Sequence, residues 1–261
     1  MVDQLNNDIK LKSIPKRIIS LVPSQTELLH DLGLEDCIVG ITKFCVHPNH
    51  YKTTKQIVGG TKQIHLDKIK ALKPDIILCN KEENTKAIVK ACQEIATTHV
   101  SDIITIDHCL ELITQYGIMF NKQHNSKIII EKVNGNLNDF KVFIKNKPIL
   151  KVAYFIWKNP WMVAAEGTFI NHLLELNNFE NCYKNLQRYP EVVINNIQTE
   201  GNPELILLSS EPYPFKTKHA LELNIIAPKA KVVLVDGEYF SWYGSRLINA
   251  FTYFKTLRKR I

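Results

Sequence analysis

The sequence predicts an α/β protein of two lobes, each built on a parallel sheet, joined by one long helix. In both halves of the chain short apolar runs alternate with helical patterns, which is typical of parallel strands with crossover helices. Between these halves the alternation stops, and apolar residues recur at spacings of three and four without a proline. We therefore expect an N-terminal lobe over residues 16–108, a connecting helix over 109–147 and a C-terminal lobe over 148–261.

The first half predicts alternating strands and helices. A strand at RIISLVP (17–23) precedes a helix at SQTELLHDLGL (24–34), with Ser24 as N-cap, Glu27 completing a capping box and Gly33 ending the helix. The elements that follow are a strand at CIVGIT (37–42), a helix at HLDKIKALK (65–73), a strand at PDIILCN (74–80), a helix at NTKAIVKACQEI (84–95) and a strand in VSDIITID (100–107).

The connecting segment predicts one long helix, and the second half again predicts strands and helices. Unbroken, the connecting helix would span roughly 50 Å, and we favour it over two helices broken near Gly135. The second half predicts strands at ILKVAYFI (149–156), PELILLSS (203–210) and AKVVLVD (230–236), a helix at EGTFINHLLELNN (166–178) capped by Thr168, and a final helix at SRLINAFTYFKTLRK (245–259).

The amino-acid composition indicates which class of protein the chain belongs to. With 45% hydrophobic and 23% charged residues the chain is typical of a folded globular protein, and it has no apolar run long enough for a transmembrane helix. The polar first 17 residues lack an apolar leader, so we expect either a cytoplasmic chain or one whose leader has been trimmed. The six cysteines show no CxxC spacing, which indicates reduced core thiols rather than a zinc knuckle.

Charge and motifs narrow the function. The net charge of +7 permits an anionic ligand, but scattered lysines without a recognised motif argue against nucleic-acid binding. The sequence has no GxGxxG, GxxxxGK, GxSxG or HExxH motif, so no nucleotide or catalytic site is indicated. The nine histidines are dispersed, and spacing alone predicts no metal site.

Three segments resemble a known family. RIISLVPSQTELLHDLGLEDCIVGIT with the later CVHP, then VGGTKQIHLDKIKALKPDIILCNKEEN, then EGTFINHLLELNNFENCY are similar to the substrate-binding proteins of cobalamin and iron(III)-siderophore ABC importers, the helical-backbone metal receptors. The likeness runs from Lys16 to Phe254. It implies two Rossmann-like lobes, a ligand cleft between them, and a non-enzymatic monomer that needs no cofactor.

The resemblance also implies the ligand and the partner. A metal chelate is expected, with a corrinoid such as cobalamin favoured over haem or a ferric siderophore. An ABC permease is the expected protein partner, docked by one acidic side chain on each lobe; Glu83 (or Glu82) and Glu191 are the candidates. The alternatives are a cytoplasmic enzyme or chaperone of corrinoid or tetrapyrrole handling, and a degenerate receptor that serves as a protein-interaction module.

Ligand contacts are expected in the loops that follow the strands, because ligands of such sheets bind outside the carboxyl ends of the strands. Phe44 inherits its role from the resemblance, and His47 is either a metal ligand or a solvated turn residue. The candidate ligand-binding residues are Phe44, His47, Thr61, Lys62, Trp161, Tyr189, Tyr213, Trp242, Tyr243 and Arg246.

Each candidate has a structural alternative. The aromatic residues could pack in their own lobe, as we expect of Phe240, and Trp161 is favoured over Trp157 as the ligand contact. Gly244 is expected to allow close approach of a ligand, and Arg246 to pair with an anionic ligand or with Glu238. The start of the helix at Ser24 could cap itself or bind an anion.

Overall fold

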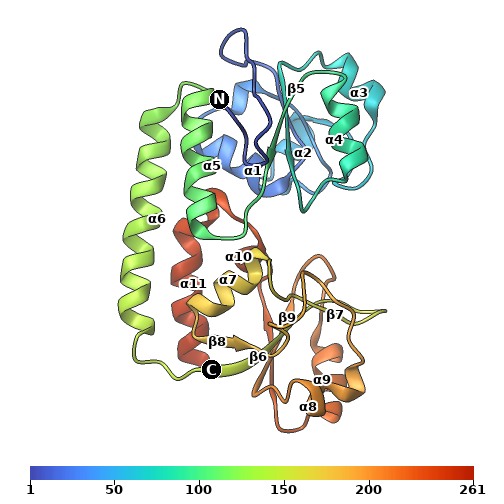
Figure 1. Cartoon of the computed structure of the whole chain (residues 1–261), viewed down its shortest axis with the longest axis vertical. Helices are drawn as coiled ribbons and strands as arrows, with labels where there is room; N and C mark the ends of the chain where they lie inside the picture. Colours follow the sequence, from blue (N-terminus) through green and yellow to red (C-terminus); the bar gives the residue numbers. More distant parts are fainter. The chain divides into compact units, whose positions relative to one another are not determined.

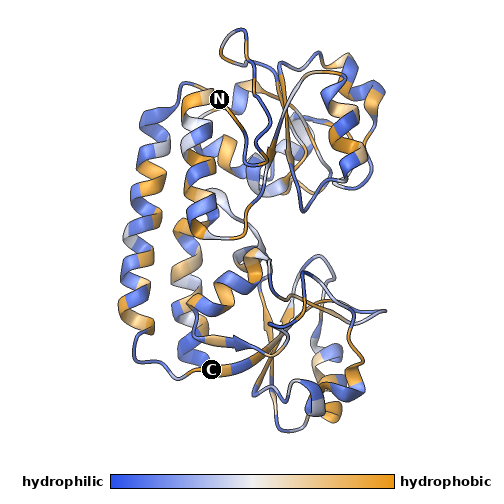
Figure 2. Cartoon of the chain, in the orientation of Figure 1, coloured by the Kyte–Doolittle hydropathy of each residue, from blue (hydrophilic) through white to orange (hydrophobic).

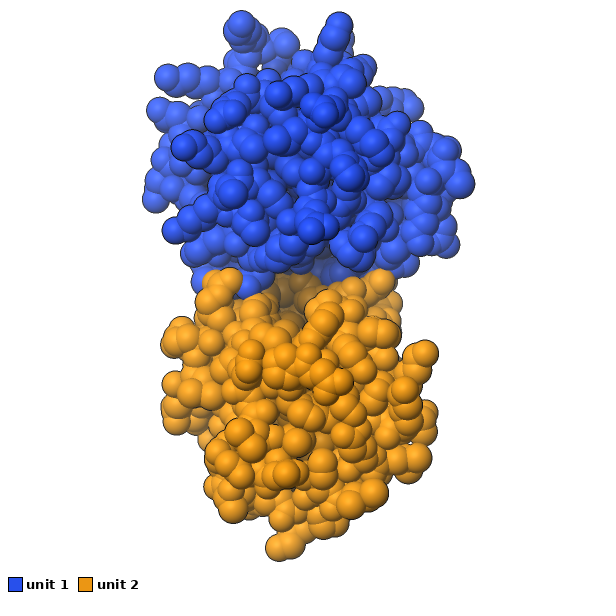
Figure 3. Space-filling model, turned by 90° about the vertical axis from the view of Figure 1, so that its right-hand side faces the viewer, with its two compact units in different colours: residues 1–134, 242–248 blue, residues 135–241, 249–261 orange.

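The computed structural model describes all 261 residues and divides into two compact units. Unit 1 comprises residues 1–134 and 242–248, and unit 2 comprises residues 135–241 and 249–261 (Figure 3). Each unit carries a sheet of mainly parallel strands with helices (Figure 1), which confirms the α/β class. The predicted C-terminal lobe, residues 148–261, included residues 242–248. The side chains of these residues instead bond to residues of unit 1, as described with the site.

Five parallel strands form the centre of unit 1, in the order β3-β2-β1-β4-β5. The strands are β1 (Ile18–Ser20), β2 (Ile38–Ile41), β3 (Gln56–Ile57), β4 (Ile76–Asn80) and β5 (Thr97–Ser101). The helices are α1 (Pro23–Asp31), a 3-10 turn η1 (Glu35–Cys37), α2 (Tyr51–Thr54), α3 (Leu66–Ala71), α4 (Lys86–Gln93) and α5 (Ile106–Met119). Every residue of β4 is buried, as expected of a central strand covered on both faces.

Helix α1 begins and ends with different signals. Ser24 is not its N-cap: Val22 is the N-cap, and Pro23 occupies the first turn, where its missing N–H leaves no donor unsatisfied. The predicted end at Gly33 is confirmed, with φ of +75° and its N–H donating to the carbonyl oxygen of His30 at 2.8 Å.

The range 109–147, predicted as one unbroken helix, contains two helices, so the predicted bounds were wrong; the chain passes from unit 1 to unit 2 within the second of these helices. Helix α5 ends at Met119 and α6 covers Gln123–Ile144, so the break lies ahead of Gly135. Asn121 has φ of 53°, a left-handed conformation that asparagine adopts more readily than most residues. The turn brings the end of α5 against the start of α6: a Cβ added to Gly117 would lie 2.2 Å from Oγ of Ser126.

Helix α6 is the longest helix, with 22 residues. Hydrophilic and hydrophobic residues alternate along it and along α11 (Figure 2), as in helices that bury one face. None of the helices combines the length and the apolar character needed to cross a bilayer.

The sheet of unit 2 has the order β10-β9-β6-β7, with β8 also paired to β6, and only the pairing with β7 is antiparallel. Its strands are β6 (Leu150–Trp157), β7 (Met162–Val163), β8 (Phe179–Asn181), β9 (Leu205–Ser209) and β10 (Lys231–Val235). Its helices are α7 (Phe169–Leu176), η2 (Ile194–Asn196), α8 (Ile197–Glu200), α9 (Thr217–Ile226) and α10 (Glu238–Ser241). The 3-10 turn η3 (Gly244–Arg246) belongs to the 242–248 segment of unit 1, and α11 (Leu247–Arg260) begins in that segment and continues in unit 2. Thr168 caps α7 as predicted, its Oγ1 accepting from the N–H of Asn171 at 3.1 Å.

The amino-terminal segment, for which the sequence predicted no element, covers the outer edge of β5. The Asp3 side chain is 2% exposed, and its Oδ2 accepts from the N–H of Val100 at 3.0 Å. Its Oδ1 accepts from the N–H groups of Leu5 and Asn7. An edge strand has unpaired N–H groups, and a carboxylate from the amino-terminal turn satisfies one of them here.

The contact between α5 and α6 yields a prediction. Replacing Gly117 with Ala should lower the free energy of unfolding by about 1–3 kcal/mol, because the new methyl group overlaps Ser126. Gly135→Ala is the matched control: nothing lies within 4 Å of its added Cβ, so it should raise stability by about 0.5–1 kcal/mol. Urea unfolding of both variants measures the difference, and equal stabilisation would contradict the close helix contact.

Candidate functional site

The loop after β2 presents an aromatic ring at the carboxyl edge of the unit 1 sheet. Phe44 is 48% exposed. A Cβ on Gly60 would lie 3.1 Å from the Phe44 ring, so glycine makes room for the ring against this turn. The Lys43 ammonium lies 5.0 Å from the ring centroid, so an exposed aromatic face and a cation occupy the same edge.

The GGTKQ turn is tied to the loop after β4. Gly59 has φ of +130°, and a Cβ there would lie 2.5 Å from the carbonyl oxygen of Gln63, so the turn requires glycine. The Asn84 amide donates to the carbonyl oxygen of Thr61 at 2.9 Å, and Lys62 Nζ donates to that of Glu82 at 2.7 Å. These bonds hold the ligand candidates Thr61 and Lys62 against the loop that carries the docking candidates Glu82 and Glu83.

Glu83 sits in the same β4–α4 loop but its carboxyl group is not an ordinary surface group. The Asn80 Oδ1 accepts from the N–H groups of Glu82 and Glu83, which fixes the turn. Burial raises the pKa of Glu83 against the opposing effect of the Lys62 charge. Glu83 therefore holds a proton more readily than a solvated glutamate.

Trp242 and Arg246 belong to an ionic cluster within unit 1. The Arg246 guanidinium makes a bidentate pair with Glu27, with N–O distances of 2.9 and 2.7 Å, and stacks 4.8 Å from the Trp242 ring centroid. His47 meets the same indole edge-on at 5.5 Å. Desolvation raises the pKa of Glu27, and Arg246 only partly offsets it. The sequence interpretation found Glu27 only as a capping residue and missed this pairing.

The Tyr243 hydroxyl belongs to a buried polar network. Tyr243 is 6% exposed, and its hydroxyl oxygen accepts from the Gln25 amide at 3.0 Å. The same amide donates to Ser101 Oγ at 2.6 Å, and the Tyr116 hydroxyl donates to Gln25 Oε1 at 2.7 Å. Burial raises the pKa of Tyr243 above its usual range, so the phenol stays protonated.

At the carboxyl edge of the unit 2 sheet the two indoles differ in exposure. Trp157 ends β6 and is 38% exposed, whereas Trp161 is 9% exposed and stacks on Phe215 in the apolar core. The sequence-based preference for Trp161 is thus opposite to the order of exposure. Tyr213, in the loop after β9, meets Trp157 edge-on at 5.6 Å.

Two further candidates lie in the segment that runs beside β7. Tyr189 is half-buried and Glu191 is exposed, with Glu191 bridged to Met162 beside β7. Phe240 is fully buried, which confirms its assignment to the core.

The cysteine and histidine side chains do not cluster into a metal-binding site. Four of the six free cysteines are buried, as predicted for core thiols. Nowhere in the 261 residues do three His, Cys, Asp or Glu side chains gather so that they could hold a metal ion.

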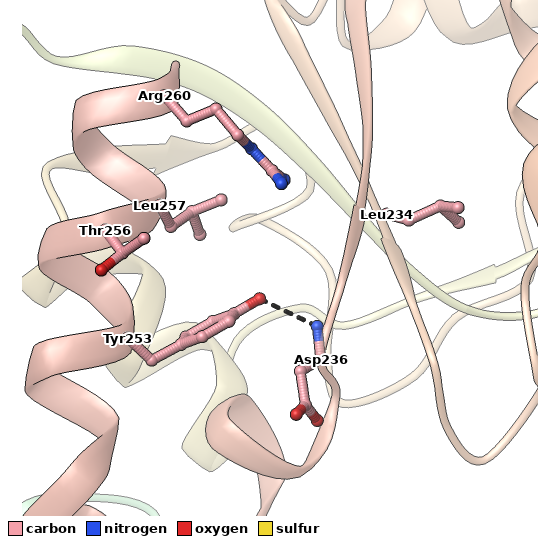
Figure 4. A pocket seen from close by; sticks show the side chains of 6 residues that line it. All are labelled: Leu234, Asp236, Tyr253, Thr256, Leu257 and Arg260. Atoms are coloured by element: carbon pink, nitrogen blue, oxygen red, sulfur yellow. Dashed lines mark hydrogen bonds between the residues drawn. The ribbon is translucent and has the colours of Figure 1, made fainter.

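A cavity of about 250 Å³ lies between edge strand β10 and α11 (Figure 4). It is lined by Leu234, Asp236, Tyr253, Thr256, Leu257 and Arg260. The Asp236 N–H donates to the Tyr253 hydroxyl oxygen at 2.9 Å. No candidate ligand residue lines this cavity.

Comparison with known proteins places the chain among binding proteins. The model of the family described as "Periplasmic binding protein" matches residues 18–223. The vitamin B12-binding protein of Pectobacterium carotovorum is 23% identical over 243 residues, 91% of this chain and 86% of that protein. The ABC transporter substrate-binding lipoprotein YvrC of Bacillus subtilis is 27% identical over 191 residues, 69% of this chain but 59% of YvrC.

Solved structures share the fold at low identity. The periplasmic vitamin B12 binding protein of Vibrio cholerae has a TM-score of 0.81 at 20% identity, covering 95% of this chain and 98% of that one. A periplasmic haem-binding protein of Pseudomonas aeruginosa has a TM-score of 0.81 at 17% identity, covering 93% and 92%. The petrobactin-binding protein YclQ of Bacillus subtilis has 0.79 at 19% identity, covering 99% and 96%.

The Arg246–Glu27 pair yields a pH-dependent prediction. Arg246→Met should lower the free energy of unfolding by roughly 3 kcal/mol at neutral pH, because it leaves a desolvated carboxylate unpaired. A carboxyl whose folded pKa is raised destabilises the fold above that pKa. The loss should therefore shrink as the pH falls through the folded pKa of Glu27 and the group becomes neutral.

Denaturant unfolding from pH 8 to pH 4 measures this loss. Lys184→Met is the control, because its pair with Glu180 is exposed, and it should change nothing measurable. A loss for Arg246→Met that is independent of pH would contradict the role given to the Glu27 charge.

Proposed function

The chain belongs to the periplasmic binding protein family, and from this premise we propose that it is a substrate-binding protein of the ABC-importer type whose ligand is a metal chelate, with a corrinoid favoured. Relatives and neighbours with the same fold are named for vitamin B12, haem and petrobactin, which supports a chelate as the class of ligand. The proposed role is binding and delivery, without catalysis.

The observation that carries the proposal is the exposure of aromatic rings at strand ends. Phe44 on unit 1 and Trp157 on unit 2 are 48% and 38% exposed, each directly at or after the carboxyl end of a strand. Large aromatic side chains commonly bury roughly 150–250 Å² each when covered. A flat, partly apolar chelate is the kind of ligand that would cover such a ring.

Four of the candidates are proposed to contact the ligand directly. Thr61 and Lys62 lie beside Phe44 in the tied GGTKQ turn, and we propose that they meet the polar rim of the ligand. Tyr189 and Tyr213 are half-buried, and we propose direct contact for both.

For three buried or paired residues the proposed role is support. Trp161, Tyr243 and Arg246 are held by a core stack, a buried network and a bidentate ion pair respectively. We propose that they shape the loops that carry the contacts, with Trp242 and His47 completing the Arg246 cluster.

Docking to a permease is proposed through one glutamate on each unit. Glu191 is exposed and available to an arginine of a membrane partner. For Glu83, whose pKa burial raises, an approaching cation would favour the ionised form.

Ligand titration tests the proposal. Cyanocobalamin, haemin or a ferric catecholate siderophore should quench tryptophan fluorescence and raise the thermal midpoint, since a ligand that binds only the folded state stabilises it. If none of the three changes either signal, the proposed function fails.

A substitution localises the contact. Trp157→Ala should weaken binding about tenfold, which corresponds to roughly 1.4 kcal/mol of lost ring contact, without changing the thermal midpoint of the free protein. Ile225→Ala, on a residue 82% exposed on α9, is the control and should leave the affinity unchanged. Unaltered affinity of Trp157→Ala would remove Trp157 from the site.

A further inference from the structure

A histidine that the sequence interpretation did not single out lies behind Tyr213. His219, on α9, is 5% exposed. Its Nδ1 accepts from the backbone N–H of Lys216 at 2.9 Å and so caps the helix. A ring nitrogen that accepts from an N–H must present its lone pair, so the hydrogen of the neutral imidazole is on Nε2.

The surroundings of His219 favour this neutral form. Desolvation lowers the pKa of His219, and the charges of Lys158, Lys218 and Lys216 lower it further, while Glu222 opposes them. At neutral pH the imidazole therefore carries one hydrogen, on the nitrogen that faces Tyr213.

The direction of the next hydrogen bond follows. His219 Nε2 lies 3.4 Å from the Tyr213 hydroxyl, so the Nε2–H donates and the phenol oxygen accepts. The reverse direction would need the hydrogen on Nδ1, where it would point at the N–H of Lys216. This is the only hydrogen bond of the Tyr213 hydroxyl, whose own hydrogen therefore has no acceptor within the protein.

The Tyr213 hydroxyl, which can still donate its hydrogen, lies at the carboxyl edge of the unit 2 sheet, where we propose that the ligand binds. Tyr213 follows β9 and Trp157 ends β6, the neighbouring parallel strand, and their rings meet at 5.6 Å. The three lysines around His219 outnumber the one glutamate, so the local charge favours an anionic acceptor.

We propose that Tyr213, oriented by His219, is a specificity-determining donor that recognises a carboxylate oxygen on the bound chelate. This inference deepens the proposed function and rests on it. A hydrogen bond to a charged acceptor is stronger than one to a neutral acceptor, so the site should distinguish acidic chelates from their esters or amides.

Matched ligands test the inference. Haemin carries two carboxylates and its dimethyl ester none, and cyanocobalamin can be compared with its monocarboxylic acid derivatives. The wild-type protein should bind an acid more tightly than its neutral counterpart. Tyr213→Phe should weaken acid binding by about 10- to 100-fold and leave ester or amide binding nearly unchanged.

The role of His219 has its own readout. In the ligand-free protein the ¹⁵N resonances of its ring should show Nε2 protonated and Nδ1 unprotonated. His219→Asn keeps an oxygen that can cap α9, but its amide nitrogen is too short to replace the Nε2–H that donates to Tyr213. The variant should therefore retain the thermal midpoint and lose part of the preference for acids. A hydrogen on Nδ1 of the wild-type protein would overturn the proposal.

The outcomes separate the two proposals. Binding that Tyr213→Phe weakens equally for acid and ester, or not at all, overturns this inference and leaves the proposed function standing. No binding of any of these ligands overturns both.

Discussion

A fully buried amide, that of Gln25, is the constraint on which unit 1 depends. Its oxygen accepts from Tyr116 on α5, and its nitrogen donates to Ser101 at the end of β5 and to Tyr243. A buried polar group left without a partner costs about 1–3 kcal/mol, so a helix, a strand and a distant segment must assemble around one side chain. Gly244 completes the arrangement: its N–H donates to a buried thiol of α5.

Much of the fold could be predicted because its signals are local. Continuous runs of Val, Ile and Leu mark buried parallel strands, and Gly33 and Thr168 mark helix boundaries through conformations and hydrogen bonds that few other residues supply. The break at Asn121 was missed because asparagine in a left-handed conformation is indistinguishable in sequence from asparagine in a helix. Two-residue strands such as β3 and β7 depend on tertiary pairing and carry no period of their own.

The candidate site was less predictable because it depends on which ring of a cluster faces inward. Trp157 and Trp161 flank the same turn, and only the antiparallel return of β7 decides that Trp161 joins the core. The spacing of Arg246 gave no sign of Glu27, since their pairing joins residues 219 positions apart. His219 was overlooked for a related reason: its importance lies in a tautomer that a backbone N–H selects.

The discontinuity of unit 1 has a consequence for how the chain matures on the ribosome. Residues 135–241 are synthesised between its two parts, which at about 5–20 residues per second takes roughly 5–20 seconds. During that interval Gln25 and Glu27 lack their partners from residues 242–248, so the nascent amino-terminal half exposes polar groups that the finished protein hides. Completion of the first unit is thus coupled in time to completion of the second, and a ribosome stalled before Trp242 would hold two unfinished units rather than one finished and one missing.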